Sequence, residues 1–303
     1  MGRRALAVAE TASVMLVIAT APSQASKLPV VYNGLTGYAH ISSTASPPGA
    51  NRWGCRTFRS HRRPVILVHG TFGDMSDNWQ ALSPLLYDRG YCVFALNYGS
   101  YAASGWIGIY GTGEIATAAH QLSMFVNRVL DATHAEQVDL VGYSLGGMMP
   151  RYYIKFLGGA AKVHTLVGLG PSNHGTTLRG FFTFANQFPG ATALLTLLCP
   201  ACQQQERGST FLTRLNAGAG SVGDVSYTII QSANDEVVTP YSSAFLPGPA
   251  VTNILLQRQC TLDHGEHLSM PYDHIADADV LTALDPKHPV KPKCSPVLPI
   301  SGG

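Results

Sequence analysis

The sequence predicts an α/β protein with a mostly parallel central sheet that is flanked by helices. Short, continuously apolar runs such as Val65-Ile66-Leu67-Val68 are typical of strands that are buried on both faces. These runs alternate with segments whose apolar residues recur every three or four positions, the clearest of which covers residues 114–133. Regular alternation of strands and helices predicts a parallel sheet with both faces covered.

The elements are expected in a simple order along the chain. Strands are predicted at residues 65–68, 92–96, 138–143, 163–169, 225–231 and 253–256, and helices at 76–89, 114–133, 145–156 and 274–284. Ser76 is the expected N-cap of the first helix. Residues 26–64 are irregular and rich in Ser, Pro and Gly, and the sequence has no internal repeat.

One long stretch, residues 171–223, does not follow the alternation. It has no strand pattern and is too long for an ordinary connection, so we expect a small helical cap or lid over the carboxyl edge of the sheet. Its apolar side chains could form the core of this cap or could line an apolar pocket. On the second interpretation, the substrate contacts in this stretch are Phe181, Phe184, Leu194 and Leu197.

The two ends of the chain differ in composition from the rest. Arg3 and Arg4, an apolar stretch at 12–21 and then Ser23-Gln24-Ala25 predict a secretory signal peptide over residues 1–25, with an amphipathic first helix as the alternative. Residues 26–303 are then one domain of a secreted, extracellular protein. Its last part, 285–303, is a Pro-rich tail that is expected to be extended.

Charge and composition exclude several classes of protein. Only 13% of the 303 residues are charged, and 20 Lys and Arg against 18 Asp and Glu give a net charge of +2. This balance argues against a nucleic-acid partner held through its phosphates. No metal cluster is visible, because Asp277, Asp279 and Asp285 are expected to form a solvated helix face rather than a calcium site.

Six cysteines agree with export to an oxidising compartment. Cys199 and Cys202 could belong to a redox or zinc motif, but no second pair of ligands lies nearby, so we expect a local disulfide. Fifteen pairings of six cysteines are possible. The remaining sequence-nearest pairs are Cys55–Cys92 and Cys260–Cys294, and the second of these would hold the tail against the body of the protein.

The segment Gly142-Tyr143-Ser144-Leu145-Gly146 is the strongest chemical motif. It follows a predicted strand and precedes a predicted helix, which is the context that a nucleophile elbow requires. An ordinary glycine-rich turn is the alternative. A serine hydroxyl is a weak nucleophile, so it needs a base to accept its proton and a carboxylate to orient that base.

Candidates for the acid and the base follow the late strands. Asp235 comes just after the strand at 225–231, at the sheet edge where α/β active sites gather, and Glu236 is the near alternative. His264, His267 and His274 follow the last strand, and spacing alone does not choose among them.

Two backbone N–H groups are expected to stabilise the oxyanion. One belongs to Leu145, the residue after the nucleophile, and the other to Thr71, in the loop after the strand at 65–68. Phe72 and Tyr143 flank these groups and are expected to contact the substrate. His69 is expected to anchor the same loop through hydrogen bonds, because its position in the chain is wrong for the base.

These motifs resemble a known family, the secreted actinobacterial lipases and esterases, which are α/β-hydrolases similar to small bacterial triacylglycerol lipases. The resemblance extends over nearly the whole chain after the signal peptide. It is carried by His69-Gly70-Thr71, Asn78-Trp79, Gly90–Leu96, Gly142–Gly147 and Asp235–Tyr241. Where that family commonly has His-Ser-Gln, this sequence has Tyr143-Ser144-Leu145, a difference that bears on packing and substrate preference.

The resemblance implies a nucleophile, acid and base at Ser144, Asp235 and His267, the last within Glu266-His267-Leu268. It implies hydrolysis of carboxylic esters without a cofactor. The Phe- and Leu-rich stretch within residues 171–223 favours a lipid ester at a lipid–water interface as the substrate. We expect the enzyme to be a monomer. The alternatives are a simple esterase, an acyltransferase with the same three residues, and a non-catalytic surface-binding protein that has kept the fold.

Overall fold

The computed structural model describes residues 1–2, 27–41, 45–57, 61–101, 104–177, 199–218 and 220–303. Within these ranges a single six-stranded parallel sheet has the strand order β2-β1-β3-β4-β5-β6. Its strands are β1 (Val65–Val68), β2 (Val93–Leu96), β3 (Val138–Tyr143), β4 (Val163–Leu169), β5 (Ser226–Gln231) and β6 (Val251–Leu255). The predicted parallel α/β architecture is confirmed.

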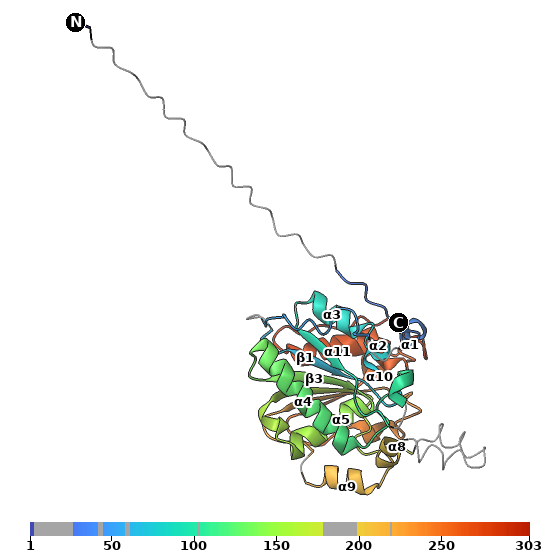
Figure 1. Ribbon diagram of the computed structural model, residues 1–303. Helices are drawn as coiled ribbons and strands as arrows, with labels where there is room; N and C mark the ends of the chain where they lie inside the picture. The colour runs from blue at the N-terminus through green and yellow to red at the C-terminus, as the bar shows by residue number, and fades with distance from the viewer. Residues whose placement is uncertain (3–26, 42–44, 58–60, 102–103, 178–198, 219) are drawn as a thin grey trace.

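Helices and short 3₁₀ turns connect the strands and cover the sheet (Figure 1). The α-helices are α1 (Gly34–Tyr38), α2 (Met75–Asn78), α3 (Leu82–Asp88), α4 (Ile115–Thr133), α5 (Leu145–Phe156), α8 (Pro200–Gln204), α9 (Thr210–Asn216), α10 (Leu256–Gln259) and α11 (His274–Leu284). The 3₁₀ turns are η1 (Ser104–Ile107), η2 (Gly159–Ala161), η3 (Tyr241–Ala244) and η4 (Met270–Tyr272).

The sheet has a hydrophobic core on each face because successive strand residues point to opposite sides. Ile66 and Val68 of β1 pack on the side of α4 and α5, while Val65 and Leu67 pack on the side of α3 and α11. Figure 1 shows these two helical layers on either side of the strands. All four side chains are fully buried, as the continuous apolar run predicted.

The helix predicted at 76–89 is wrong in detail, since two short helices, α2 and α3, occupy this stretch. Asp74, not Ser76, is the N-cap of α2, and its carboxylate accepts hydrogen bonds from the backbone N–H groups of Ser76 and Asp77. Pro84 lies in the first turn of α3, where a missing N–H costs no helical hydrogen bond. A single helix would have placed this proline in its interior.

The predicted solvated face of the last helix is also wrong. Asp277 is fully buried and Asp279 is nearly so, whereas Asp285 just after the helix is partly exposed. Tyr32 makes an edge-on ring contact with His274 of α11 and lies near Asp277, so the irregular segment before β1 packs over this face of α11. Burial raises the pKa of Asp279 to about 6 and the pKa of Asp277 well above its usual value.

The cysteines form the three expected disulfides, Cys55–Cys92, Cys199–Cys202 and Cys260–Cys294. The last of these joins the extended tail to the end of α10. The described parts of residues 171–223 contain the short helices α8 and α9 and no strand. The proposed signal peptide falls almost wholly on residues 3–26, outside the described ranges, and no described helix is long and apolar enough to span a membrane.

Candidate active site

Ser144 lies at the tip of a sharp turn between β3 and α5. Its backbone has φ +54° and ψ −120°, a conformation that non-glycine residues rarely adopt. The flanking glycines make this turn possible. A Cβ at Gly142 would lie 1.8 Å from the carbonyl oxygen of Gly146, and a Cβ at Gly146 would lie 2.1 Å from that of Val68. The turn therefore presents the hydroxyl at the carboxyl edge of the sheet, as a nucleophile elbow does.

His267 and Asp235 reach this hydroxyl from loops at the same edge of the sheet. The Ser144 hydroxyl donates to His267 Nε2 over 3.0 Å, and His267 Nδ1 donates to Asp235 Oδ2 over 2.8 Å. Because a carboxylate can only accept, Nδ1 carries the proton and Nε2 is left to accept one. Asp235 Oδ1 accepts hydrogen bonds from the backbone N–H groups of Val237 and Val238, which fix its orientation.

The alternative candidates for the base and the acid lie elsewhere. His264 is exposed, and His274 begins α11, where its ring bonds the backbone of Lys293 and Gly303. Glu236 does not bond His267 but lines the cavity beside it. Of the residues weighed, only Asp235 and His267 make direct contacts in this chain of hydrogen bonds.

Carboxylates surround the imidazole and control its protonation. Burial favours the neutral ring, but Asp235 and, more weakly, Glu236 and Glu266 outweigh burial, so the pKa of His267 lies above 6.5. Burial, and next the neighbouring Glu266 carboxyl, raise the pKa of Glu236 to about 7. A raised pKa makes His267 a stronger base once it is neutral.

The loop after β1 lies directly against the nucleophile. A Cβ at Gly70 would lie 2.9 Å from the Tyr143 ring and 3.2 Å from Ser144 Cβ, so only glycine allows this approach. His69 is fully buried under the loop, where Nδ1 donates to the Gly70 carbonyl and Nε2 accepts from the N–H of Tyr98. Burial lowers the pKa of His69 to about 4, so it is a neutral anchor at pH 7.

Two backbone N–H groups in the segments that adjoin Ser144 have no acceptor within the described part of the chain. Among the described residues, nothing accepts a hydrogen bond from the N–H of Thr71 or of Leu145. The N–H of Phe72, the neighbouring candidate, donates to the Tyr110 carbonyl over 2.9 Å. Thr71 and Leu145 therefore match the pattern of an oxyanion hole, while Phe72 contributes its side chain alone.

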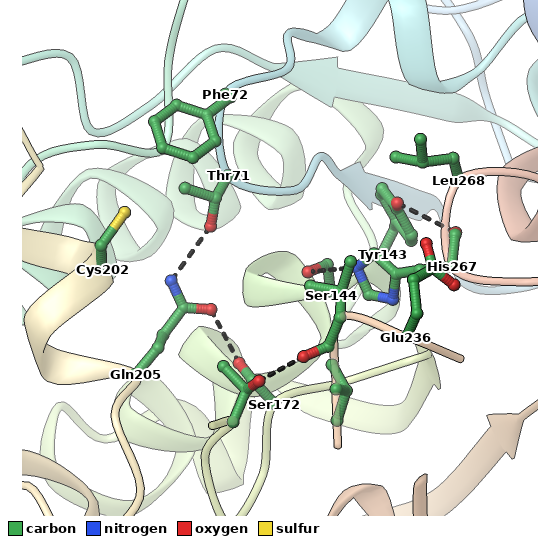
Figure 2. Close-up of a pocket in the computed structure, with 13 residues that line it drawn as sticks. Thr71, Phe72, Tyr143, Ser144, Ser172, Cys202, Gln205, Glu236, His267 and Leu268 are labelled. Atoms are coloured by element: carbon green, nitrogen blue, oxygen red, sulfur yellow. Dashed lines mark hydrogen bonds between the residues drawn. The ribbon is translucent and has the colours of Figure 1, made fainter. Parts of the chain in front are cut away.

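A cavity of about 450 Å³ opens in front of the hydroxyl (Figure 2). Its walls are mainly apolar and come from the loops at the carboxyl edge of the sheet and from α8. The lining residues are Thr71, Phe72, Tyr143, Ser144, Ser172, Thr176, Cys202, Gln205, Glu236, Val237, Val238, His267 and Leu268. A volume in this range suits a small organic ligand or one chain of a larger one.

The predicted substrate contacts are only partly described by the structure. Of these residues, Phe72 and Tyr143 line the cavity. Phe181, Phe184, Leu194 and Leu197 lie outside the described residues. Sequence reasoning missed the wall formed by Ser172, Thr176, Cys202, Gln205, Val237, Val238 and Leu268. The closely spaced pair Cys199 and Cys202 was the one feature of the sequence that pointed to α8 as an ordered element.

The tail of the chain holds the loop that carries His267. The buried Glu266 carboxylate accepts hydrogen bonds from the N–H groups of Leu268 and Ser269 in its own loop and of Ile300 in the tail. On the other side, the Tyr143 hydroxyl donates to the His267 carbonyl over 3.0 Å. The loop that carries the imidazole is therefore held both by the tail and by the turn that carries Ser144.

In the described part of the chain, no three His, Cys, Asp or Glu side chains come together in a way that could hold a metal ion. The groups gathered at this edge of the sheet are suited to a different chemistry: a hydroxyl, an imidazole bonded to a carboxylate, and two backbone N–H donors without an acceptor among the described residues. These are the groups that acyl transfer through a serine nucleophile requires.

Solved structures share the fold at low sequence identity. Lipase B of Aspergillus fumigatus matches with a TM-score of 0.57 and 20% identity, over 82% of this chain and 57% of that one. The mature form of the Bacillus licheniformis lipase BlEst2 matches with a TM-score of 0.55 and 15% identity, over 76% of this chain and 94% of that one. The fold is that of the α/β-hydrolases.

Curated relatives are triacylglycerol lipases from bacteria. The one from Burkholderia plantarii is 34% identical over 123 residues, which are 39% of this chain and 31% of the relative. The one from Pseudarthrobacter phenanthrenivorans is 36% identical over 101 residues, which are 32% of this chain and 29% of the relative. The matched stretch is thus less than a third of the length of either relative. The family model for lipases of class 2 matches residues 62–267, from the lead into β1 to the candidate base, and the chain belongs to this family.

Proposed function

We propose that this protein hydrolyses carboxylic esters of lipids through a covalent acyl-enzyme on Ser144. The observation that carries the proposal is the hydrogen-bonded chain from Ser144 through His267 to Asp235, which faces a mainly apolar cavity. Membership of the class 2 lipases and the bacterial triacylglycerol lipases among the relatives support an ester of a lipid as the substrate.

In the first half of the reaction, Ser144 Oγ attacks the ester carbonyl carbon while its proton passes to His267 Nε2. The carbonyl oxygen becomes an oxyanion that accepts hydrogen bonds from the N–H groups of Thr71 and Leu145. The tetrahedral intermediate then breaks its bond to the alcohol oxygen, which takes the proton from His267 and leaves. Asp235 stabilises the transient imidazolium and keeps its orientation.

In the second half, water repeats these steps on the acyl-enzyme. Water gives a proton to His267 Nε2 and adds to the acyl carbon, and the intermediate expels Ser144 Oγ, which recovers the proton. The products are a carboxylic acid and the free enzyme. Every group named belongs to one chain, which supports a monomer as the active unit.

Exposed apolar side chains beside the cavity support action at a lipid–water interface. Phe72 and Leu268 both line the cavity and remain 38% and 40% exposed. The segment that follows η1 pairs with the Phe72 loop, since the N–H of Tyr110 donates to the Gly73 carbonyl. Within η1, the Trp106 side chain is 91% exposed. A Trp ring that is exposed to water is more stable at the surface of a lipid layer.

Three disulfides support export of the protein. Disulfides persist in oxidising compartments and are rare where thiols are kept reduced. Together with the signal-like residues 1–25, they lead us to propose a secreted, extracellular enzyme.

Replacing Ser144 by Ala tests the proposed nucleophile. We expect hydrolysis of p-nitrophenyl butyrate to fall at least ~10³-fold and labelling by a fluorophosphonate probe to disappear. Ser242→Ala changes an exposed serine far along the chain and serves as the matched control, with activity and labelling retained. If Ser144→Ala keeps more than a few per cent of the wild-type rate while its unfolding midpoint is unchanged, Ser144 is not the nucleophile.

Hydrolysis of tributyrin across its solubility limit tests the preference for an interface. A rise in rate when the emulsion forms is expected for a lipase, and Trp106→Ser should reduce this rise without changing the rate on the dissolved ester. A rate that does not change when the emulsion forms would instead indicate a simple esterase.

A further inference from the structure

The side-chain amide of Gln205 bridges two loops of the candidate active site. Gln205 follows α8, is 6% exposed and lies across the cavity from His267 (Figure 2). Its Nε2 donates to Thr71 Oγ1 over 3.0 Å, and its Oε1 accepts from the Ser172 hydroxyl over 2.8 Å. The loop after β1 and the loop after β4 are thus joined through one amide.

The orientation of this amide is fixed by its partners. Nε2 also lies 3.2 Å from the backbone carbonyl of Ala201, which can only accept a hydrogen bond. The nitrogen must therefore face Ala201 and Thr71, and the oxygen must face Ser172. A carboxylate or an apolar side chain of the same shape could not make this set of contacts.

The backbone of Gln205 is held as firmly as its side chain. Its N–H donates to the Ala201 carbonyl over 3.0 Å, and its carbonyl accepts from the N–H of Thr176 over 2.9 Å. The Cys199–Cys202 disulfide closes the short helix α8 just before it. Gln205 is therefore a fixed point on the wall of the cavity.

Thr71 is the residue that this fixed point restrains. The N–H groups of its neighbours Gly70 and Phe72 are bound to Asn78 Oδ1 and to the Tyr110 carbonyl, while the N–H of Thr71 itself has no protein acceptor in the described chain. A β-branched side chain is stiff about its first torsion angle, so holding Oγ1 restrains the rotation of the whole residue. The direction of the Thr71 N–H is thereby restrained as well.

We propose that Gln205 is a positioning residue of the ester-cleaving reaction: by holding Thr71 Oγ1, it keeps the N–H of Thr71 aimed at the oxyanion. This inference rests on the proposed function. On this proposal, α8 and its disulfide stiffen the side of the oxyanion hole that Thr71 forms. Because an oxyanion donor acts in the transition state more than in the ground state, its misalignment lowers kcat more than it raises KM.

Gln205→Leu keeps the volume of the side chain and removes all of its hydrogen bonds. Loss of an entire oxyanion donor costs ~10²–10³ in rate, and a misaligned donor should cost less. We expect kcat for p-nitrophenyl butyrate to fall about 10- to 50-fold with KM within about threefold of wild type. The matched control is Gln204→Leu, because Gln204 is the preceding residue, the last of α8, and its amide bonds Ile115 and Glu114 at the start of α4 instead of the cavity wall. It should leave kcat within about twofold.

Gln205→Glu gives a readout that a purely structural role would not move. An ionised carboxylate cannot donate to Thr71 Oγ1 and adds negative charge beside the oxyanion, whereas the protonated acid can donate. The ratio of variant to wild-type kcat should therefore rise as the pH is lowered. Dividing by the wild-type rate at each pH removes the titration of His267.

Thr71→Val is the second variant, and it keeps the backbone N–H while removing Oγ1. It should reproduce the fall in kcat, and combining it with Gln205→Leu should add little, since both remove one contact. Unchanged kcat in both single variants, a raised KM with unchanged kcat, or a pH-independent ratio for Gln205→Glu would each overturn the proposal. Failure of the wild-type protein to hydrolyse esters or to be labelled by the fluorophosphonate would instead refute the proposed function.

Discussion

Replacing Asp273 by Asn should make the protein more stable at alkaline pH. Asp273 is the N-cap of α11 and is 1% exposed. Burial, followed by the nearby Asp263 carboxylate, raises its pKa from 3.8 to about 8, and Asp279 adds a smaller repulsion. Burial raises the pKa of Asp263 as well, and the nearby His274 and His264 oppose this rise only in part.

The sign of the effect follows from proton linkage. Between about pH 4 and pH 8 the folded protein keeps the Asp273 proton, which the unfolded chain has lost, so the free energy of unfolding falls as the pH rises. A rise in the pKa of Asp273 from 3.8 to about 8, at ~1.36 kcal/mol per pKa unit, corresponds to a change of about 5–6 kcal/mol in the free energy of unfolding. Because Asp263 titrates with Asp273 and remains in the variant, we expect about half of this, roughly 2–3 kcal/mol, to be recovered at pH 8.

Asn keeps the capping geometry, because its side-chain oxygen can accept the bonds that Asp273 receives from the N–H groups of Ile275 and Ala276. Urea unfolding followed by circular dichroism at pH 5 and pH 8 measures the effect. Asp285→Asn is the control, because the hydrogen bond from His288 lowers the pKa of Asp285 and its removal should not stabilise the protein at pH 8. Equal pH slopes for wild type and Asp273→Asn would refute the reasoning.

Two further predictions concern the acidic limb of activity and the disulfides. Since His267 must be neutral to act as a base, kcat/KM should fall as the pH drops through a pKa above 6.5. Glu236→Gln should move this fall in kcat/KM to lower pH by about 0.5 unit, because a negative charge near His267 is lost. An unchanged pH profile would exclude Glu236 as a contributor to the pKa of His267. Removing Cys260–Cys294, which closes 34 residues, should destabilise the protein by about 4 kcal/mol, against about 2 kcal/mol for Cys199–Cys202, which closes three. Urea unfolding of the paired Cys→Ser variants checks this order, and the reverse order would contradict it.

Sequence patterns predicted the sheet well because strand burial leaves a strong local signature. The runs at 65–68 and 138–143 coincide with β1 and β3, and the long helix at 114–133 differs from α4 by one residue. The helix at 76–89 failed because amphipathic spacing continues across the break between α2 and α3. Pro84, in the first turn of α3, is the local signal of that break, because a proline in a helix interior removes a helical hydrogen bond.

The buried acids of α11 could not be found in this way. A pattern of polar residues on an outer helix face predicts solvent there only if no other segment covers it. Here the chain before β1 places Tyr32 near Asp277, 245 positions away in the sequence, and no periodic pattern of residues indicates this proximity. Whether an irregular segment covers a terminal helix depends on the tertiary fold and leaves no local pattern in the sequence.

The parts of the site also differ in how far they could be predicted, because only some of them leave a local pattern in the sequence. Ser144 was found from a local motif, and its link to His267 and Asp235 follows from parallel strands that end at one edge. Gln205 and Ser172 come from segments without regular spacing, so their meeting at Thr71 became visible only in three dimensions.

The tie between Glu266 and the tail has a consequence for the order in which the enzyme matures. The elbow around Ser144 is built from residues close together in sequence, whereas the His267 loop is completed by Ile300 and by a bond between Cys260 and Cys294. In a chain whose last two thiols are still reduced, the turn at Ser144 can therefore form before the loop that carries His267 is fixed. In such a chain we expect the loop that carries His267 to be held less firmly than in the oxidised protein.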